Sequence, residues 1–195
     1  MVKDSVKKKI DKVIKETWLK EICKEYGSGL FAQEIGLQCA MYHHLRAKLD
    51  PLMKREGLFI YPGFTFKEPG HHADLAICQA DMSKDVYYLE EALTDIAAVV
   101  QLRFSGSQEY FDADVPRLRQ YIQDLGFHAQ YYFGVIQETE QQIRLPWLDP
   151  NSMSRWAGGC FTHLNAGYQD DGAFFEVTAY NGLNLQSKRV RCELR

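Results

Sequence analysis

A short and almost wholly apolar segment at residues 96–104 constrains the fold most. Its sequence, Ile-Ala-Ala-Val-Val-Gln-Leu-Arg-Phe, has too many apolar residues in succession for a strand with one face in water. It is also far too short to span a membrane as a helix. We therefore predict an interior strand of a sheet that is covered on both faces, which indicates an α/β domain with a mixed central sheet flanked by helices.

Two helices are predicted ahead of this strand. Residues 2–26 carry apolar side chains at helical spacing, and glycines follow directly. The second helix is expected from about residue 30 to residue 49, where Asp50-Pro51 weakens or stops it. Its apolar stripe consists of Leu30, Leu37, Met41 and Leu45.

Further strands are predicted from alternating, β-branched and aromatic residues in five segments: residues 58–66, 73–78, 130–136, 160–165 and 173–180. The last two are expected to pair as a hairpin, because the turn sequence Gln-Asp-Asp-Gly at 169–172 joins them. Residues 85–94 suit either a strand or a helical turn.

A third helix is predicted over residues 112–125. Asp112 or Asp114 can cap its beginning, Pro116 stands near its first turn, and Gly126 follows its end.

The chain of 195 residues shows no internal repeat and no linker, so we predict a single domain. Residues 1–29 form an N-terminal helix, residues 30–125 a core, and residues 126–195 an extension of the sheet with the hairpin. The sequence does not indicate a function for residues 137–159, which can be a dimer arm, a substrate loop or simple packing. A homodimer is an open alternative for the whole chain.

Charge and cysteine content narrow the function classes. The net charge of −3 counts against strong non-specific binding of nucleic acid by the whole surface. Five cysteines without a Cys-x-x-Cys pair favour free thiols in a reducing cytoplasm over a disulfide framework. Neither a signal peptide nor a membrane-spanning segment is expected.

Basic residues are nevertheless concentrated near both ends of the sequence. They are interpreted either as solvated faces or as surfaces that flank a phosphate backbone. The first group is Lys3, Lys7, Lys8, Lys9, Lys12, Lys15, Lys20 and Lys24, and the second is Lys188, Arg189, Arg191 and Arg195.

Four polar residues stand where apolar ones are expected. Glu34 falls on the apolar stripe of its helix, where a carboxylate is costly unless it is paired or binds a metal. Asp74 begins a strand. Gln101 and Arg103 interrupt the apolar strand at alternate positions and so point to the same face of the sheet. Solvated positions for Glu34 and Asp74, and an edge strand for the other two, are the structural alternatives.

The pattern of these residues resembles the PD-(D/E)XK nuclease superfamily, which has a restriction-endonuclease-like fold. The matching sequences are Ala-Gln-Glu-Ile-Gly-Leu-Gln around Glu34, His-His-Ala-Asp-Leu-Ala-Ile around Asp74, and Val-Val-Gln-Leu-Arg-Phe at 99–104. The resemblance covers about half of the chain, roughly residues 31–123. It implies a nuclease-like core and hydrolysis of a DNA phosphodiester that depends on Mg²⁺, with Mn²⁺ as a substitute.

In such a site carboxylates hold Mg²⁺, which polarises the phosphate and lowers the pKa of a bound water molecule. The resemblance assigns the metal to Glu34, Asp74, Gln101 and the backbone carbonyl of Leu102. It places Arg103 on the phosphate, as the fourth catalytic residue beside Glu34, Asp74 and Gln101.

Two positions depart from the family pattern. Gln101 replaces an acidic residue and brings no charge to the metal, and Arg103 replaces a lysine and cannot act as a base near neutral pH. An acid from another position can compensate, and Glu90, Glu91, Asp95 and Glu109 are candidates. The alternative function is therefore a catalytically inactive nuclease-fold protein that binds nucleic acid or serves as a subunit of an assembly.

Overall fold

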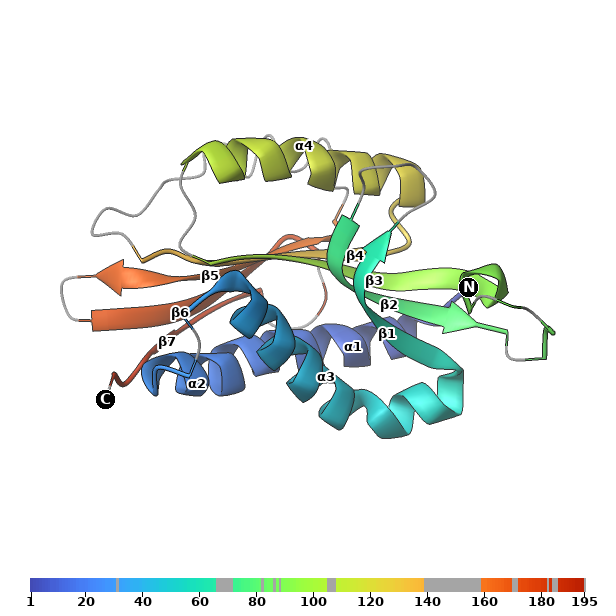
Figure 1. Ribbon diagram of the computed structural model, residues 1–195, viewed down its shortest axis with the longest axis horizontal. Coiled ribbons are helices and arrows are strands. Elements are labelled where there is room, and N and C mark those ends of the chain that lie inside the picture. Colours follow the sequence, from blue (N-terminus) through green and yellow to red (C-terminus); the bar gives the residue numbers. More distant parts are fainter. Residues whose placement is uncertain are drawn as a thin grey trace.

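The apolar segment at residues 96–104 lies inside a mixed sheet, which has seven strands in the part of the chain that is described (Figure 1). A computed structural model describes residues 1–30, 32–65, 72–81, 83–85, 87, 89–104, 108–138, 159–169, 172–181, 183 and 186–194. The strands follow one another in space as they do in the chain: β1 (Leu58–Thr65), β2 (His72–Ala80), β3 (Leu93–Phe104), β4 (Gln130–Ile136), β5 (Phe161–Gln169), β6 (Gly172–Ala179) and β7 (Ser187–Arg191).

The strands β3, β4 and β5 are parallel, and all other neighbouring strands are antiparallel. The sheet is thus mixed and has β3 in its interior. The helical segments are α1 (Asp4–Thr17), η1 (Trp18–Ile22), α2 (Cys23–Gly27), α3 (Glu34–Glu56), η2 (Leu89–Ala92) and α4 (Gln108–Leu125). This architecture confirms the predicted α/β class with a mixed central sheet flanked by helices.

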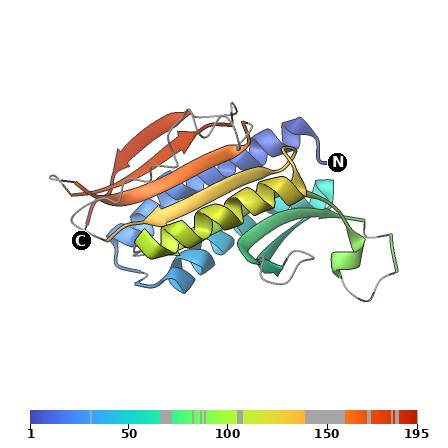
Figure 2. The same cartoon turned by 90° about the horizontal axis from the view of Figure 1, so that it is seen from above.

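Helices cover both faces of the sheet, as Figures 1 and 2 show. On one face α1, η1, α2 and α3 pack on a core that includes Leu75, Val100 and Phe175. On the other face α4 covers a second core, which includes Val99 and Phe133. Alternate residues of β3 therefore enter opposite cores, which explains why nearly every position in this strand is apolar.

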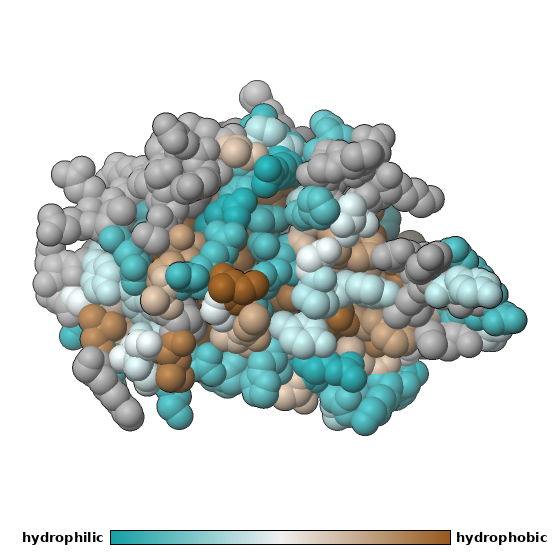
Figure 3. All heavy atoms as spheres, viewed as in Figure 1, coloured by the Kyte–Doolittle hydropathy of each residue, from teal (hydrophilic) through white to brown (hydrophobic). Residues whose placement is uncertain are grey.

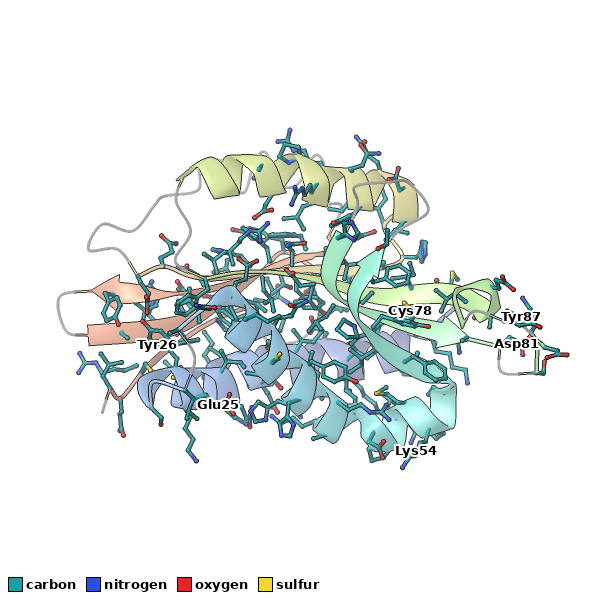
Figure 4. The ribbon with its side chains drawn as sticks, in the orientation of Figure 1. Glu25, Tyr26, Lys54, Cys78, Asp81 and Tyr87 are labelled. Atoms are coloured by element: carbon teal, nitrogen blue, oxygen red, sulfur yellow. The ribbon has the colours of Figure 1, made fainter. Side chains whose placement is uncertain are left out.

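The N-terminal helical segment is confirmed and contains an irregularity. One turn, η1, is a π-helix between α1 and α2. Trp18 begins this turn, is fully buried, and donates from Nε1 to the backbone oxygen of Asn165 at 3.2 Å. At the end of α2, Tyr26 reaches β5, where its hydroxyl is 2.7 Å from that of Tyr168 (Figure 4).

The second helix, α3, differs from its prediction at both ends. Leu30 lies before the helix and is exposed, so its assignment to the apolar stripe was wrong. Pro51 does not stop the helix, which continues to Glu56. The buried stripe extends through Leu49, Leu52 and Met53, and this packing outweighs the hydrogen bond that proline removes. Gly57, with φ of 63°, ends the helix in the left-handed conformation.

The third helix, α4, begins at Gln108 and not at Asp112. Pro116 consequently lies inside the helix, and Asp114 is a buried residue of its second turn, not a cap. The error has a clear cause: Asp and Pro are typical of a helix start, but neither is confined to it.

At the C-terminal end, the hairpin of β5 and β6 is confirmed. The strand β7 was not predicted, because three of its five residues are charged and its sequence, Ser-Lys-Arg-Val-Arg, resembles a solvated tail. Of residues 137–159, those at 139–158 lie outside the described residues.

The surface is mixed in character. On the face that Figure 3 shows, hydrophobic side chains lie scattered among hydrophilic ones and do not form one continuous area. Within the described residues, no helix has both the length and the apolar character needed to cross a membrane.

Packing at Gly134 gives a first prediction. A Cβ atom at this position would lie 2.6 Å from Cδ2 of Leu102 and 3.3 Å from the Trp18 ring. We expect Gly134→Ala to lower the free energy of unfolding by about 1–3 kcal/mol, measured by urea denaturation, because the core is overpacked. Adding Leu102→Ala removes the clashing atom, so the double variant should lose less than the sum of the two single losses. Additive losses would contradict this account.

Candidate functional site

Five side chains from four elements are linked near the carboxyl end of β3. Glu34 begins α3, Asp74 lies in β2, Gln101 and Arg103 lie in β3, and Asp114 lies in α4. We call these residues the central polar cluster. The structure thus brings together all four side chains predicted from the sequence and adds Asp114.

Arg103 is held by two carboxylates. Its Nε and one terminal nitrogen donate to the two oxygens of Asp114, the second bond being 2.6 Å long. The other terminal nitrogen donates to Oε1 of Glu34 at 2.6 Å. A planar guanidinium fits this bidentate arrangement, which a lysine cannot make. Hence Arg103 connects α3 and α4, which cover opposite faces of the sheet.

The two partners of Arg103 differ in exposure. The Asp114 side chain is fully buried, whereas that of Glu34 is 39% exposed. A buried carboxylate needs a cation, and Arg103, only 15% exposed, supplies it. Burial alone would lower the pKa of Arg103, but the hydrogen bonds and charge of Asp114, with Glu34 and Asp74, raise it above its ordinary value.

Asp74 forms the second part of the central polar cluster. Its Oδ2 accepts hydrogen bonds from Nε2 of Gln101 at 2.7 Å and from the backbone nitrogen of Leu102 at 2.6 Å. The backbone oxygen of Asp74 accepts a further bond from Gln38 of α3 at 2.8 Å. Asp74 is therefore fixed to β3 on one side and to α3 on the other.

The acidity of Asp74 is weakened by its surroundings. Burial raises its pKa from 3.8 to about 6, and the negative charges of Glu34 and Asp114 act in the same direction. The hydrogen bond from Leu102 and the charge of Arg103 oppose this rise. Asp74 therefore exchanges its proton just below neutral pH.

Gln101 leaves one polar atom without a partner. Its side chain is buried, and its Oε1 accepts no hydrogen bond among the described residues. In the register of the sheet, Gln101 lies opposite Phe133, and Phe133 lies opposite His163. Nε2 of His163 is also buried, and it has no hydrogen-bond partner in the part of the chain that the structure describes. Burial lowers the pKa of His163 to about 4, so its ring is neutral near pH 7.

The polar groups of the central polar cluster are turned toward one another. Among the described residues, no three His, Cys, Asp or Glu side chains are grouped so that they can hold a metal ion. Glu34 is bound to Arg103, and Gln101 turns its nitrogen, not its oxygen, toward Asp74. A hard cation needs several anionic or carbonyl oxygens facing one point. The magnesium site inferred from the resemblance stays a prediction.

Two of the four acids suggested as replacements are described with their side chains, and both lie away from the central polar cluster. Asp95 is in β3, but six residues before Gln101, which corresponds to about 20 Å along a strand. It is 3.3 Å from His128 instead. Glu91 lies farther back still, in η2. The side chains of Glu90 and Glu109 lie outside the described residues.

Sequence reasoning missed Asp114 as a member of the cluster. A usable signal was present: Asp114 falls on the same helical stripe as Leu118, Tyr121 and Ile122, at spacings of four, three and one, and these residues are buried. The interpretation of Asp114 as a cap hid this stripe. Gln38 was missed as well, although it ends the matching sequence around Glu34 and lies four residues, about one helical turn, after it.

Comparison with known proteins found no matching family model, no similar curated protein and no matching solved structure. The resemblance to PD-(D/E)XK nucleases is therefore a hypothesis that rests on the residues of this chain.

The ion pairs of Arg103 give a second prediction. Arg103→Ala leaves Asp114 buried without its cation, so we expect a loss of about 3–5 kcal/mol in the free energy of unfolding. The control is Arg117→Ala: Arg117 is half exposed and 3.6 Å from Asp114, so its removal should cost less than about 1 kcal/mol. Equal losses in urea denaturation would show that Asp114 does not depend on Arg103.

The pKa of Asp74 gives a third prediction. Because this pKa is higher in the folded protein than in the unfolded chain, the folded state binds the proton more tightly, and this stabilising contribution is lost as pH rises. The rise from 3.8 to about 6 corresponds to roughly 3 kcal/mol, at about 1.4 kcal/mol per pH unit. Between pH 4 and pH 6 the wild type should lose this stability relative to Asp74→Asn, measured by urea denaturation.

The exposed residue Asp85 provides the control, since Asp85→Asn should follow the wild type throughout this range. A constant difference between wild type and Asp74→Asn would exclude the raised pKa. Removing the nearby charge in Glu34→Gln should move the midpoint of the Asp74 titration to lower pH, as NMR of the carboxyl group can show.

Proposed function

We propose that this chain is a restriction-endonuclease-like protein that binds nucleic acid without cleaving it. The observation that carries the proposal is the position of Arg103, whose guanidinium lies between Glu34 and Asp114. In the nucleases that the chain resembles, acidic residues of this kind hold a metal and the basic residue acts on the phosphate. In this protein these groups neutralise one another.

The order of elements supports the nuclease-like part of the proposal. An acidic residue at the start of α3 is followed by β1, by Asp74 in β2, by the polar pair in β3, and by α4. The resemblance implies this order. Convergence of Glu34, Asp74, Gln101 and Arg103 into one cluster gives further support, because the resemblance implies that these four positions share a site.

A second candidate is the Mg²⁺-dependent hydrolysis of DNA. Two observations favour it: Asp74 is retained, and Oε1 of Gln101 has no partner among the described residues. Rotation of the Gln101 amide would present this oxygen toward Asp74. In an extended strand the N–H and C=O of one residue point to the same side, so the Leu102 carbonyl also faces β2. When bound there, Mg²⁺ would supply a Lewis acid.

The fourth prediction separates these functions by restoring the family pattern. The variant Gln101→Glu/Arg103→Lys supplies an anionic ligand and frees Glu34 from the guanidinium. We expect the wild type to bind DNA without cleaving it and to show no heat of Mg²⁺ or Mn²⁺ binding in titration calorimetry. The variant should bind these ions, and adding Asp74→Ala should abolish that binding.

Two results would overturn the proposal. Cleavage of plasmid or single-stranded DNA by the wild type that is lost in Asp74→Ala would establish hydrolysis as the function. Failure of the wild type to bind duplex or single-stranded DNA at low salt would exclude nucleic acid as its ligand. Folding of each variant is verified by circular dichroism, because a lysine at position 103 cannot make the bidentate contact with Asp114.

A further inference from the structure

The two basic segments of the sequence meet at one groove. It has a volume of about 280 Å³ and lies between the end of α1, the π-helical turn η1 and the strand β7. Lys12, Lys15 and Lys20 come from the N-terminal segment and Lys188 from β7, 168 or more positions later in the chain. Figure 1 shows β7 on the side of the sheet where α1 and α2 lie.

The lining of this lysine groove is strongly asymmetric in charge. Its lining contains four lysines and one carboxylate, that of Glu16. Two apolar residues, Leu19 and Val190, complete the lining. Such a surface attracts anions and supports the apolar part of a ligand at the same time. The whole chain has a net charge of −3, so this concentration of positive charge is local.

The four lysines differ in how exposed they are and in whether a carboxylate of the protein already lies close to them. Lys15 is buried, and its amine is 2.9 Å from Asp11 and 3.3 Å from Asn181, so it belongs to the floor of the groove. Lys20 is exposed and lies 3.7 Å from Glu16, a distance that an exposed pair leaves readily. Lys12 and Lys188 are exposed, and within the described residues neither has a carboxylate within ion-pair distance.

The π-helical turn shapes the groove. A π-turn takes more residues than an α-turn and is frequent at functional sites. Here it carries Leu19 and Lys20, which line the groove, while Trp18 anchors the turn in the core. The irregularity is held in place by buried contacts and not by the lysines themselves.

We infer that the lysine groove binds the phosphate backbone of a nucleic acid. This inference rests on the proposed function and gives that function its binding surface. Separated ammonium groups fit successive phosphates of a polyanion, and counterion release makes such contacts strongly dependent on salt. The central polar cluster is a poor alternative, because its guanidinium is already bound by carboxylates.

The fifth prediction tests the groove by charge reversal. Lys12→Glu/Lys188→Glu removes two available cations, and we expect it to weaken DNA binding at least ~10-fold at 0.1 M salt. The slope of the logarithm of the affinity against the logarithm of the salt concentration should fall by about 2, since each phosphate contact contributes about 0.9. Fluorescence anisotropy with a labelled 20-nucleotide DNA, single-stranded or duplex, measures both quantities.

The matched control is Lys9→Glu/Lys84→Glu. It changes the net charge equally, but Lys9 influences Glu56 at the end of α3, and Lys84 follows β2. The control should bind within about twofold of the wild type. If both double variants weakened DNA binding equally, the inference would be overturned. The binding would then depend on the overall charge of the protein and not on a site at the groove.

A second arm uses inorganic tripolyphosphate as the probe. It should shift the backbone amide NMR signals of Leu19 and Val190 in the wild type but not in Lys12→Glu/Lys188→Glu. If these shifts occur without any binding of DNA, the groove is an anion site and the proposed function fails. If DNA binds with no dependence on Lys12 and Lys188, the groove inference fails and the proposed function stands.

Discussion

The bidentate contact between Arg103 and Asp114 is the interaction on which the arrangement of this protein depends. It lies between β3 and α4, and the additional bond from Arg103 to Glu34 extends it to α3. The fully buried carboxylate of Asp114 would be strongly destabilising without the guanidinium. One side chain of the sheet thereby links the two helical layers to each other.

The same interaction explains the behaviour of Asp74. It stands beside two further carboxylates, and the charge of Arg103 offsets their effect only in part. Its Oδ2 is stabilised by hydrogen bonds from the amides of Gln101 and Leu102. Burial and the neighbouring negative charges therefore raise its pKa to about 6. An acidic residue at position 101 would add another negative charge here, which a site without a metal would not tolerate. The neutral glutamine adds no charge and donates a hydrogen bond to Asp74.

Particular residues show how far the sequence could predict this structure. The strand at residues 96–104 and the polar pair within it were recognisable because burial on two faces leaves few polar positions. The extent of α3 was not, because local signals at Asp50-Pro51 oppose tertiary packing through Leu52 and Met53. Asp114 was misplaced for a similar reason, since local capping chemistry concealed a buried stripe. Spacing could indicate that Glu34 and Arg103 share a site, but not that they form an ion pair.

The central polar cluster and the lysine groove differ in the sign of their charge. The central polar cluster holds three carboxylates and one guanidinium, that of Arg103. With the half-exposed Arg117 beside Asp114 included, these described residues carry a charge of −1 when Asp74 is ionised (two positive charges against three negative ones). A polyanion is repelled there unless a divalent cation enters first. The lysine groove has the opposite sign, and Asp11 already neutralises its buried Lys15. Under the proposed function, phosphate would therefore be bound by the lysines of α1 and β7 and not at the carboxylates of the central polar cluster.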